Sequence, residues 1–342
     1  MKVSRWMHVA GIAAVVTAVA LAGTLGVAKA PAAATASGWK STLVLDTGGP
    51  NDNGFNKNQI VGLHQATAAI GGATDQVLLS NSDSDYSPNY TTAVNGGSDI
   101  IIAAGFLLGD TVKNFAQNHQ AIKFAITDDP ASAIGGYANE MGITYTTQQG
   151  GCLVGVLAAK EAQSMGTKVI GVVGGISIPP VNSYIAGYKF CAQKAVPGTQ
   201  VVIQYSGNFT DESSCAALAK NEIDNNHAQV IFQVAGGCGD GALKYAGSHG
   251  KWGVGVDTDE AAVANNVLTS ALKKTDVGVK TAVLAAFHKT WKGGKNFNLN
   301  LKNGGVGIGA IDPSVPAAWK NLMNKYKKQI ITGQLHPPAV IH

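Results

Sequence analysis

The fold of this chain is decided by the stretch Asp46-Thr47-Gly48-Gly49-Pro50-Asn51-Asp52-Asn53-Gly54-Phe55-Asn56. An apolar run typical of a β-strand, residues 42–45, precedes it, and apolar residues at helical spacing follow it from Ile60 to Ile70. Strand, glycine-rich turn and helix together indicate the first βα unit of a parallel sheet, so we expect an α/β fold. Ligands of such sheets bind at the carboxyl ends of the strands, where this turn lies.

The side chains of this turn indicate what it binds. The spacing matches neither the dinucleotide fingerprint nor a P-loop, because Gly48-Gly49 is not followed by Lys-Ser/Thr. The turn instead holds carboxylates, amides and one aromatic ring, Phe55, a set that suits a flat, neutral, hydroxyl-rich ligand. The alternative is that Asp52 or Asn53 only caps the helix while Phe55 packs into the core.

Composition narrows the classes of partner. The chain has 342 residues, of which 45% are hydrophobic and 13% charged, so it can bury one large core or two medium ones. The formal net charge of +4 is carried almost wholly by scattered lysine, and the one arginine is Arg5. No basic stripe with interleaved aromatics is present, so nucleic-acid binding is not expected. Beyond Arg5 the chain also lacks the forked donor favoured for phosphate recognition.

The first residues have the pattern of an export signal. Lys2 and Arg5 precede an apolar run over residues 9–27, and small residues at 28–30 and 34–36 offer cleavage sites. Residues 1–36 are therefore expected to be a signal peptide or a membrane anchor, since an apolar run of about 19 residues is also long enough to span a bilayer. Either way we expect an exported protein that is extracellular, periplasmic or held at the cell surface.

Beyond the leader, strand-like and helix-like segments alternate in two similar sets. We expect lobe 1 over residues 40–145, completed by 268–297, and lobe 2 over residues 146–267, completed by 298–342. This division implies parallel sheets flanked by helices, three hinge-like crossings, and a ligand cleft between the lobes.

Several segments in chain order resemble a known family. Besides the opening turn they are residues 174–188, 232–239, 253–260 and 269–273, the last reading Thr-Ser-Ala-Leu-Lys. Together they are similar to the basic membrane protein family of ABC-transporter substrate-binding lipoproteins, of the purine nucleoside receptor type, and the resemblance covers residues 41–338. It implies the two-lobe fold of type I periplasmic-binding proteins. The family's lipobox cysteine is missing, because the first cysteine is Cys152.

The resemblance implies a function and partners. It predicts a receptor, acting as a monomer without a cofactor, that captures a nucleoside and delivers it to an ABC permease in the membrane. Asp257 and Lys273 match the family's ribose-binding pair, in which a carboxylate accepts from hydroxyls and an ammonium donates to them. Gly236 and Gly237 would let backbone amides approach the sugar.

The remaining candidate residues would hold the base. Phe55 from lobe 1 and Tyr184 from lobe 2 are expected to form two aromatic walls, since stacking contributes about 1–3 kcal/mol per base. Tyr184 stands where the family usually has Phe, and a purely structural role in the core is the alternative. Asp46, Asp52 and Asn56 are candidates for the base edge and the geometry of the turn, although helix capping explains Asp52 and Asn56 almost equally well.

The cysteine count suggests disulfides. Four cysteines in an exported chain allow three pairings. Cys191 and Cys215 lie on consecutive predicted helices around one strand, and we expect them to be bonded, which leaves Cys152 and Cys238 near the cleft. No CxxC or other metal-like spacing occurs, so no metal site is expected.

Two other functions remain as alternatives. A receptor of the same fold for a pentose or another small sugar is the first, although such receptors commonly use arginine on the sugar hydroxyls. A nucleoside-processing enzyme is the second alternative. A nucleoside hydrolase would need a calcium-binding aspartate cluster, and Asp83 and Asp85 match such a cluster poorly. No nucleophile elbow or HExxH motif occurs, and we do not expect an enzyme.

Overall fold

Two parallel-dominated sheets organise the protein. The structure is a computed structural model that describes residues 38–342, and the predicted signal peptide or anchor lies outside the described residues. Both sheets belong to one unit of the chain, residues 36–342. Within the described part, no helix is long and apolar enough to cross a membrane.

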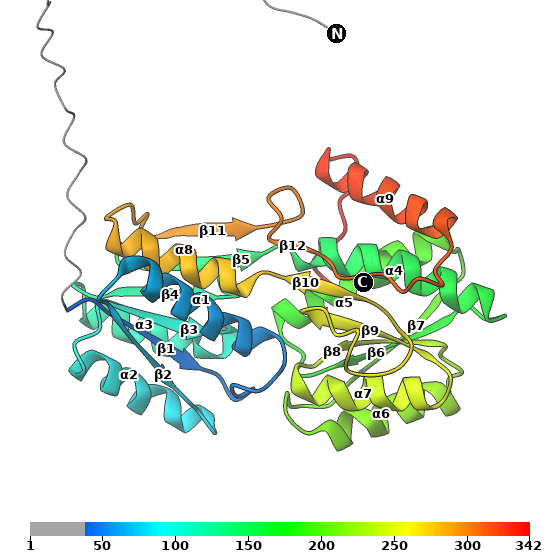
Figure 1. Cartoon of the computed structure of the whole chain (residues 1–342), viewed down its shortest axis with the longest axis horizontal. Helices are drawn as coiled ribbons and strands as arrows, with labels where there is room; N and C mark the ends of the chain where they lie inside the picture. Colours follow the sequence, from blue (N-terminus) through cyan, green and yellow to red (C-terminus); the bar gives the residue numbers. More distant parts are fainter. Residues whose placement is uncertain (1–37) are drawn as a thin grey trace, which may run out of the picture. The chain divides into compact units, whose positions relative to one another are not determined.

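The first sheet has the strand order β11-β5-β4-β3-β1-β2, and all of its strand pairs are parallel (Figure 1). Its strands are β1 (Lys40–Leu45), β2 (Thr74–Leu78), β3 (Ile100–Ala104), β4 (Lys123–Thr127), β5 (Glu140–Tyr145) and β11 (Lys295–Leu299). Its helices are α1 (Phe55–Ile70), α2 (Tyr86–Asn95), α3 (Gly109–Asn118) and α8 (Thr275–Phe287), with short 3₁₀ turns η1 (Asp83–Asp85) and η2 (Phe106–Leu108).

The second sheet has the order β12-β10-β9-β8-β6-β7, and only β12 runs antiparallel to its neighbour. Its strands are β6 (Val169–Gly174), β7 (Gln200–Tyr205), β8 (Val230–Val234), β9 (Trp252–Asp257), β10 (Val267–Lys273) and β12 (Val306–Ile308). Its helices are α4 (Thr147–Ser164), α5 (Pro179–Ala195), α6 (Glu212–Asp224), α7 (Gly237–Ser248) and α9 (Ala317–Ile331).

Each sheet buries both of its faces, which explains the continuous apolar runs in its strands. In β1, Leu43 and Leu45 pack with α1 and α8, whereas Val44 between them packs with α2 and α3 on the other face. In the second sheet, α4, α5 and α9 cover one face, and α6 and α7 cover the other. These layers hold the strand ends in place and thereby position the loops that follow them.

The chain passes between the sheets three times, after β5, β10 and β11. The predicted boundary gave residues 268–297 to lobe 1, and this boundary is wrong at its start. Strand β10 pairs with β9 of the second sheet, so the crossing comes after Lys273. The sequence does not show which strand β10 pairs with, so the predicted boundary falls before β10 instead of after it.

The predicted disulfide between Cys191 and Cys215 is also wrong. The structure pairs Cys152 with Cys191, and Cys215 with Cys238. Helix α5 connects β6 outward to the edge strand β7, whereas α6 connects β7 back past β6 to β8. With right-handed crossovers, this reversal of direction puts α5 and α6 on opposite faces of the sheet, so their cysteines cannot meet.

Candidate functional site

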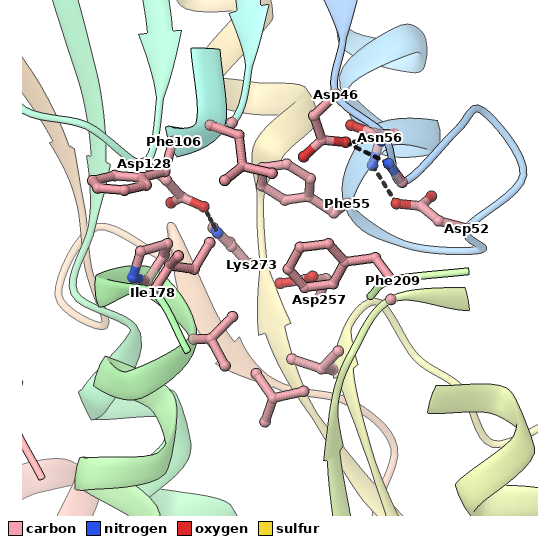
Figure 2. A pocket seen from close by; sticks show the side chains of 18 of the residues that line it. Asp46, Asp52, Phe55, Asn56, Phe106, Asp128, Ile178, Phe209, Asp257 and Lys273 are labelled. Carbon is pink, nitrogen blue, oxygen red and sulfur yellow. Dashed lines mark hydrogen bonds and ion pairs between the residues drawn. The ribbon is translucent and has the colours of Figure 1, made fainter. Parts of the chain in front are cut away.

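A pocket lies at the carboxyl ends of strands from both sheets, and every predicted ligand residue except Gly237 lines it. It encloses about 590 Å³ of space free of protein atoms, including part of its opening to solvent. Figure 2 shows that charged side chains and phenylalanine rings share this space.

Asp46 forms a polar corner on the first-sheet side. Its Oδ1 accepts from the Gly48 amide at 2.9 Å and from Asn56 Nδ2 at 2.8 Å, and no hydrogen bond from the described residues reaches its Oδ2. Burial raises the pKa of Asp46 to about 6, although these two donors lower it. Asn56 Oδ1 is buried without a partner. This corner therefore offers acceptors to a ligand that carries N–H or O–H groups.

Asp52 supports the turn. Its carboxylate accepts from the backbone amides of Gly54, Asn56 and Lys57, at 3.1, 2.7 and 3.1 Å. These bonds satisfy free donors at the start of α1, as expected of a capping carboxylate. Burial raises the pKa of Asp52, and the three amides oppose that shift. Its acceptors are thus largely occupied, which favours the capping interpretation of this residue.

Lys273 forms an ion pair with Asp128, a residue that was not among the predicted ligand residues. Its ammonium is bonded to Asp128, and both side chains are almost fully buried. The ammonium also lies 4.5 Å from the ring centroid of Phe55 and 5.0 Å from that of Tyr145. Asp128, with a left-handed φ of 72°, follows β4, so this ion pair joins the two sheets across the pocket.

Asp257 ends β9 and is held by Tyr184. The Tyr184 hydroxyl donates to Asp257 Oδ1 at 3.0 Å. Burial raises the pKa of Asp257 to about 6, while nearby Lys273 lowers it. Tyr184 is only 2% exposed and packs edge-on against Phe232, with ring centroids 6.2 Å apart. Its ring is therefore part of the core, and its hydroxyl positions Asp257.

The pocket contains two aromatic rings that the sequence reasoning missed, Phe106 and Phe209 (Figure 2). Phe106 follows β3 in the first sheet, and Phe209 lies in the loop after β7 in the second. Both come shortly after the carboxyl end of a parallel strand, and that position was the available signal. Phe55 and Phe209 thus supply one ring from each sheet.

The opening turn also touches the second sheet directly. Asn53 Nδ2 donates to Asp240 Oδ2 of α7 at 3.0 Å. A Cβ added at Gly54 would lie 3.4 Å from Asp257 Cβ, and one at Gly237 would lie 3.6 Å from Asp52 Cα. Both distances are ordinary van der Waals contacts, so a side-chain methyl would fit at either glycine. Gly237 does not line the pocket, whereas Gly236, with φ of 54°, does line it.

The sequence profile described as ABC transporter substrate-binding protein PnrA-like matches residues 40–336. The chain belongs to this family. The predicted family is thereby confirmed, and family members bind a small molecule outside the cytoplasm and work with a membrane permease. This is a family of binding proteins, and the pocket of this chain is lined by charged residues and phenylalanine rings.

Individual relatives match over most of their length. The ABC transporter nucleoside-binding protein BmpA of Lactococcus lactis is 29% identical over 88% of this chain and 89% of its own. Basic membrane protein A of Borreliella burgdorferi is 32% identical over 88% of each chain. A crystal structure of an ABC transporter solute-binding protein from Aeropyrum pernix is similar with a TM-score of 0.78 at 21% identity, covering 88% and 94% of the two chains. That likeness confirms the predicted fold class.

Proposed function

We propose that this protein captures a nucleoside, with a purine as the preferred base, between its two sheets for delivery to an ABC permease. The observation that carries the proposal is the content of one pocket: phenylalanine rings from both sheets beside four carboxylates and an ammonium. A flat base needs apolar walls and a sugar needs acceptors and donors, and this pocket offers both.

Phe55 and Phe209 are the walls for the base in this proposal, in place of the predicted pair Phe55 and Tyr184. Asp257 accepts from the ribose hydroxyls, and the Lys273–Asp128 pair donates to and accepts from the same end of the ligand. Asp46 Oδ2 accepts from a donor on the base edge. The nucleoside-binding relative from Lactococcus lactis supports the same ligand class.

A pentose or other small sugar is the competing ligand. A solute-binding protein from Burkholderia graminis in complex with D-arabinose has a similar structure, with a TM-score of 0.63 at 15% identity, and this likeness concerns the fold alone. Three phenylalanine rings line the pocket of the present chain. Stacking between aromatic rings suits a flat base, which favours the nucleoside.

Mass spectrometry of ligand released from gently purified protein tests the proposal. We expect a purine nucleoside in the released fraction, and thermal unfolding should show a rise of about 5 °C in melting temperature with adenosine, guanosine or inosine at a large excess over Kd. Ribose and xylose should leave the melting temperature unchanged. Release of a pentose, or stabilisation by pentoses alone, would assign the protein to the sugar receptors.

A further inference from the structure

A buried polar cluster lies directly behind the second-sheet wall of the pocket. It consists of Gln233 on β8, Glu260 after β9 and Ser270 on β10, which are 0%, 2% and 0% exposed. Glu260 Oε2 accepts from Gln233 Nε2 at 2.6 Å and from the Val256 amide at 2.9 Å. The Glu260 amide donates to Ser270 Oγ at 3.0 Å. One carboxyl oxygen thus gathers donors from two neighbouring strands.

This cluster connects to the pocket at two points. Gln233 Oε1 accepts from the Ala235 amide at 2.9 Å, immediately before Gly236, which lines the pocket. Val256, held by Glu260, lines the pocket together with Asp257. The strands leave room for the cluster, because a Cβ added at Gly255 would lie 2.5 Å from both Glu260 Oε2 and Ser270 Oγ.

We propose that Glu260 is a positioning residue for the ligand site, holding Gln233 and the Val256 amide so that Gly236 and Asp257 face the ligand. That the positioned segments bind a nucleoside rests on the proposed function. The effect of Glu260 on the positions of Gly236 and Asp257 does not depend on it. Without Glu260, two buried N–H donors lose their acceptor, and neither has a water-exposed alternative.

The surroundings of Glu260 determine its charge. Burial raises its pKa to about 8, Asp240 from α7 and Asp257 from β9 add to that shift, and its two donors oppose it. The groups that face it from β8 and β10, Gln233 and Ser270, are uncharged, and the ammonium of Lys273 further along β10 is bonded to Asp128.

We therefore expect the neutral acid to predominate at neutral pH. In that form Oε2 still accepts from both donors. Above about pH 8 a buried anion forms close to Asp257, since both groups then carry a negative charge in a medium that screens them poorly. We expect the ligand site to weaken as the pH rises through this value.

Glu260→Gln is the decisive variant, because glutamine keeps the accepting oxygen and cannot ionise. Binding of adenosine, whose base does not titrate in this range, is measured by calorimetry from pH 7 to pH 9. The parent should lose up to about tenfold in affinity. The glutamine variant should bind within about threefold of the parent at pH 7 and stay constant to pH 9. Glu260→Leu, which removes the acceptor, should bind about 10- to 100-fold more weakly at pH 7.

Glu222→Gln is the matched control. Glu222 on α6 of the same sheet is fully buried, its pKa is raised to about 9 by burial, and it does not line the pocket. The affinity of Glu222→Gln for adenosine should depend on pH in the same way as that of the parent. An equal loss of affinity with pH in the parent and in Glu260→Gln would overturn the proposal.

Amide hydrogen exchange without ligand separates this inference from the proposed function. Residues 234–237 and 256–258 should exchange faster in Glu260→Leu than in the parent, and at the parent's rate in Glu260→Gln. Unchanged exchange in the leucine variant would contradict the positioning role, whatever the ligand is. Failure of the parent to bind any nucleoside, with the expected exchange pattern, would contradict the proposed function alone.

Discussion

The helices on the two sheets are held by different means. On the second sheet, disulfides join α4 to α5 on one face and α6 to α7 on the other. All four cysteines are used there, so α1, α2, α3 and α8 on the first sheet depend on packing and hydrogen bonds without a disulfide. The pocket wall from the second sheet also rests on the buried Gln233–Glu260 pair, whereas the wall from the first sheet is a turn held by capping bonds. The difference indicates that the second sheet supplies the more strongly constrained wall.

Removing a disulfide should have the largest effect on the stability of the fold. Cys152→Ala with Cys191→Ala opens a loop of 39 residues and should lower the free energy of unfolding by about 2–4 kcal/mol, measured by urea denaturation. The Cys215–Cys238 disulfide closes a loop of only 23 residues. The double variant Cys215→Ala with Cys238→Ala should therefore lose slightly less unfolding free energy. A loss below about 0.5 kcal/mol for either pair would show that packing suffices on this sheet as well.

Loss of the Asp257 carboxylate should have the largest effect on binding. Asp257→Ala leaves the Tyr184 hydroxyl and the ligand hydroxyls without their acceptor, so the affinity for adenosine should fall by about 2–5 kcal/mol in calorimetry. Asp224→Ala, an exposed aspartate of α6 paired with Lys220, is the control and should bind like the parent. Binding within twofold of the parent by folded Asp257→Ala would exclude it from the site.

Substitutions of the aromatic residues distinguish the predicted pair of walls, Phe55 and Tyr184, from the pair proposed from the structure, Phe55 and Phe209. Phe55→Ala and Phe209→Ala should each weaken adenosine binding by about 1–3 kcal/mol, since each removes one stacking surface. Tyr184→Phe keeps its ring and loses only a hydrogen bond to Asp257, so we expect about 1 kcal/mol or less. The reverse order of effects would restore Tyr184 as the wall.

Two carboxylates on opposite sides of the pocket should make binding depend on pH. Burial raises the pKa of both Asp46 and Asp257 to about 6, from 3.8. Ligand donors favour the ionised forms, so the contribution of these two carboxylates to affinity should be constant above about pH 7, apart from the separate effect of Glu260 near pH 8, and should weaken by up to about tenfold per carboxylate between pH 6 and pH 5. Asp46→Asn should remove part of this dependence.

The unliganded protein should respond to pH in the opposite direction. Because the folded state binds these two protons more tightly than the unfolded chain does, their contribution to stability decreases as the pH rises from about 4 to about 6. Chemical unfolding of the parent and of Asp46→Asn in that range measures this contribution. Equal pH profiles of the parent and the variant, in both binding and unfolding, would contradict the raised pKa of Asp46.

Local patterns in the sequence were sufficient for the fold and for most of the pocket. The alternation of strands and helices predicted two α/β sets, and the turn from Asp46 to Asn56 lies at the pocket as expected. What the sequence did not reveal depends on the strand order. Because α5 and α6 lie on opposite faces of the sheet, their cysteines bond to other helices and not to each other. Because the ends of β4 and β10 meet across the pocket, Lys273 bonds to Asp128.

Calorimetric titration of the parent protein with adenosine and with ribose tests the central claim most directly, because it measures how much of the affinity depends on the base. We predict one adenosine bound per chain, at least about tenfold more tightly than ribose, since a base stacked between Phe55 and Phe209 contributes about 1–3 kcal/mol or more. Ribose binding as tight as that of adenosine, or no binding of any nucleoside, would contradict the account.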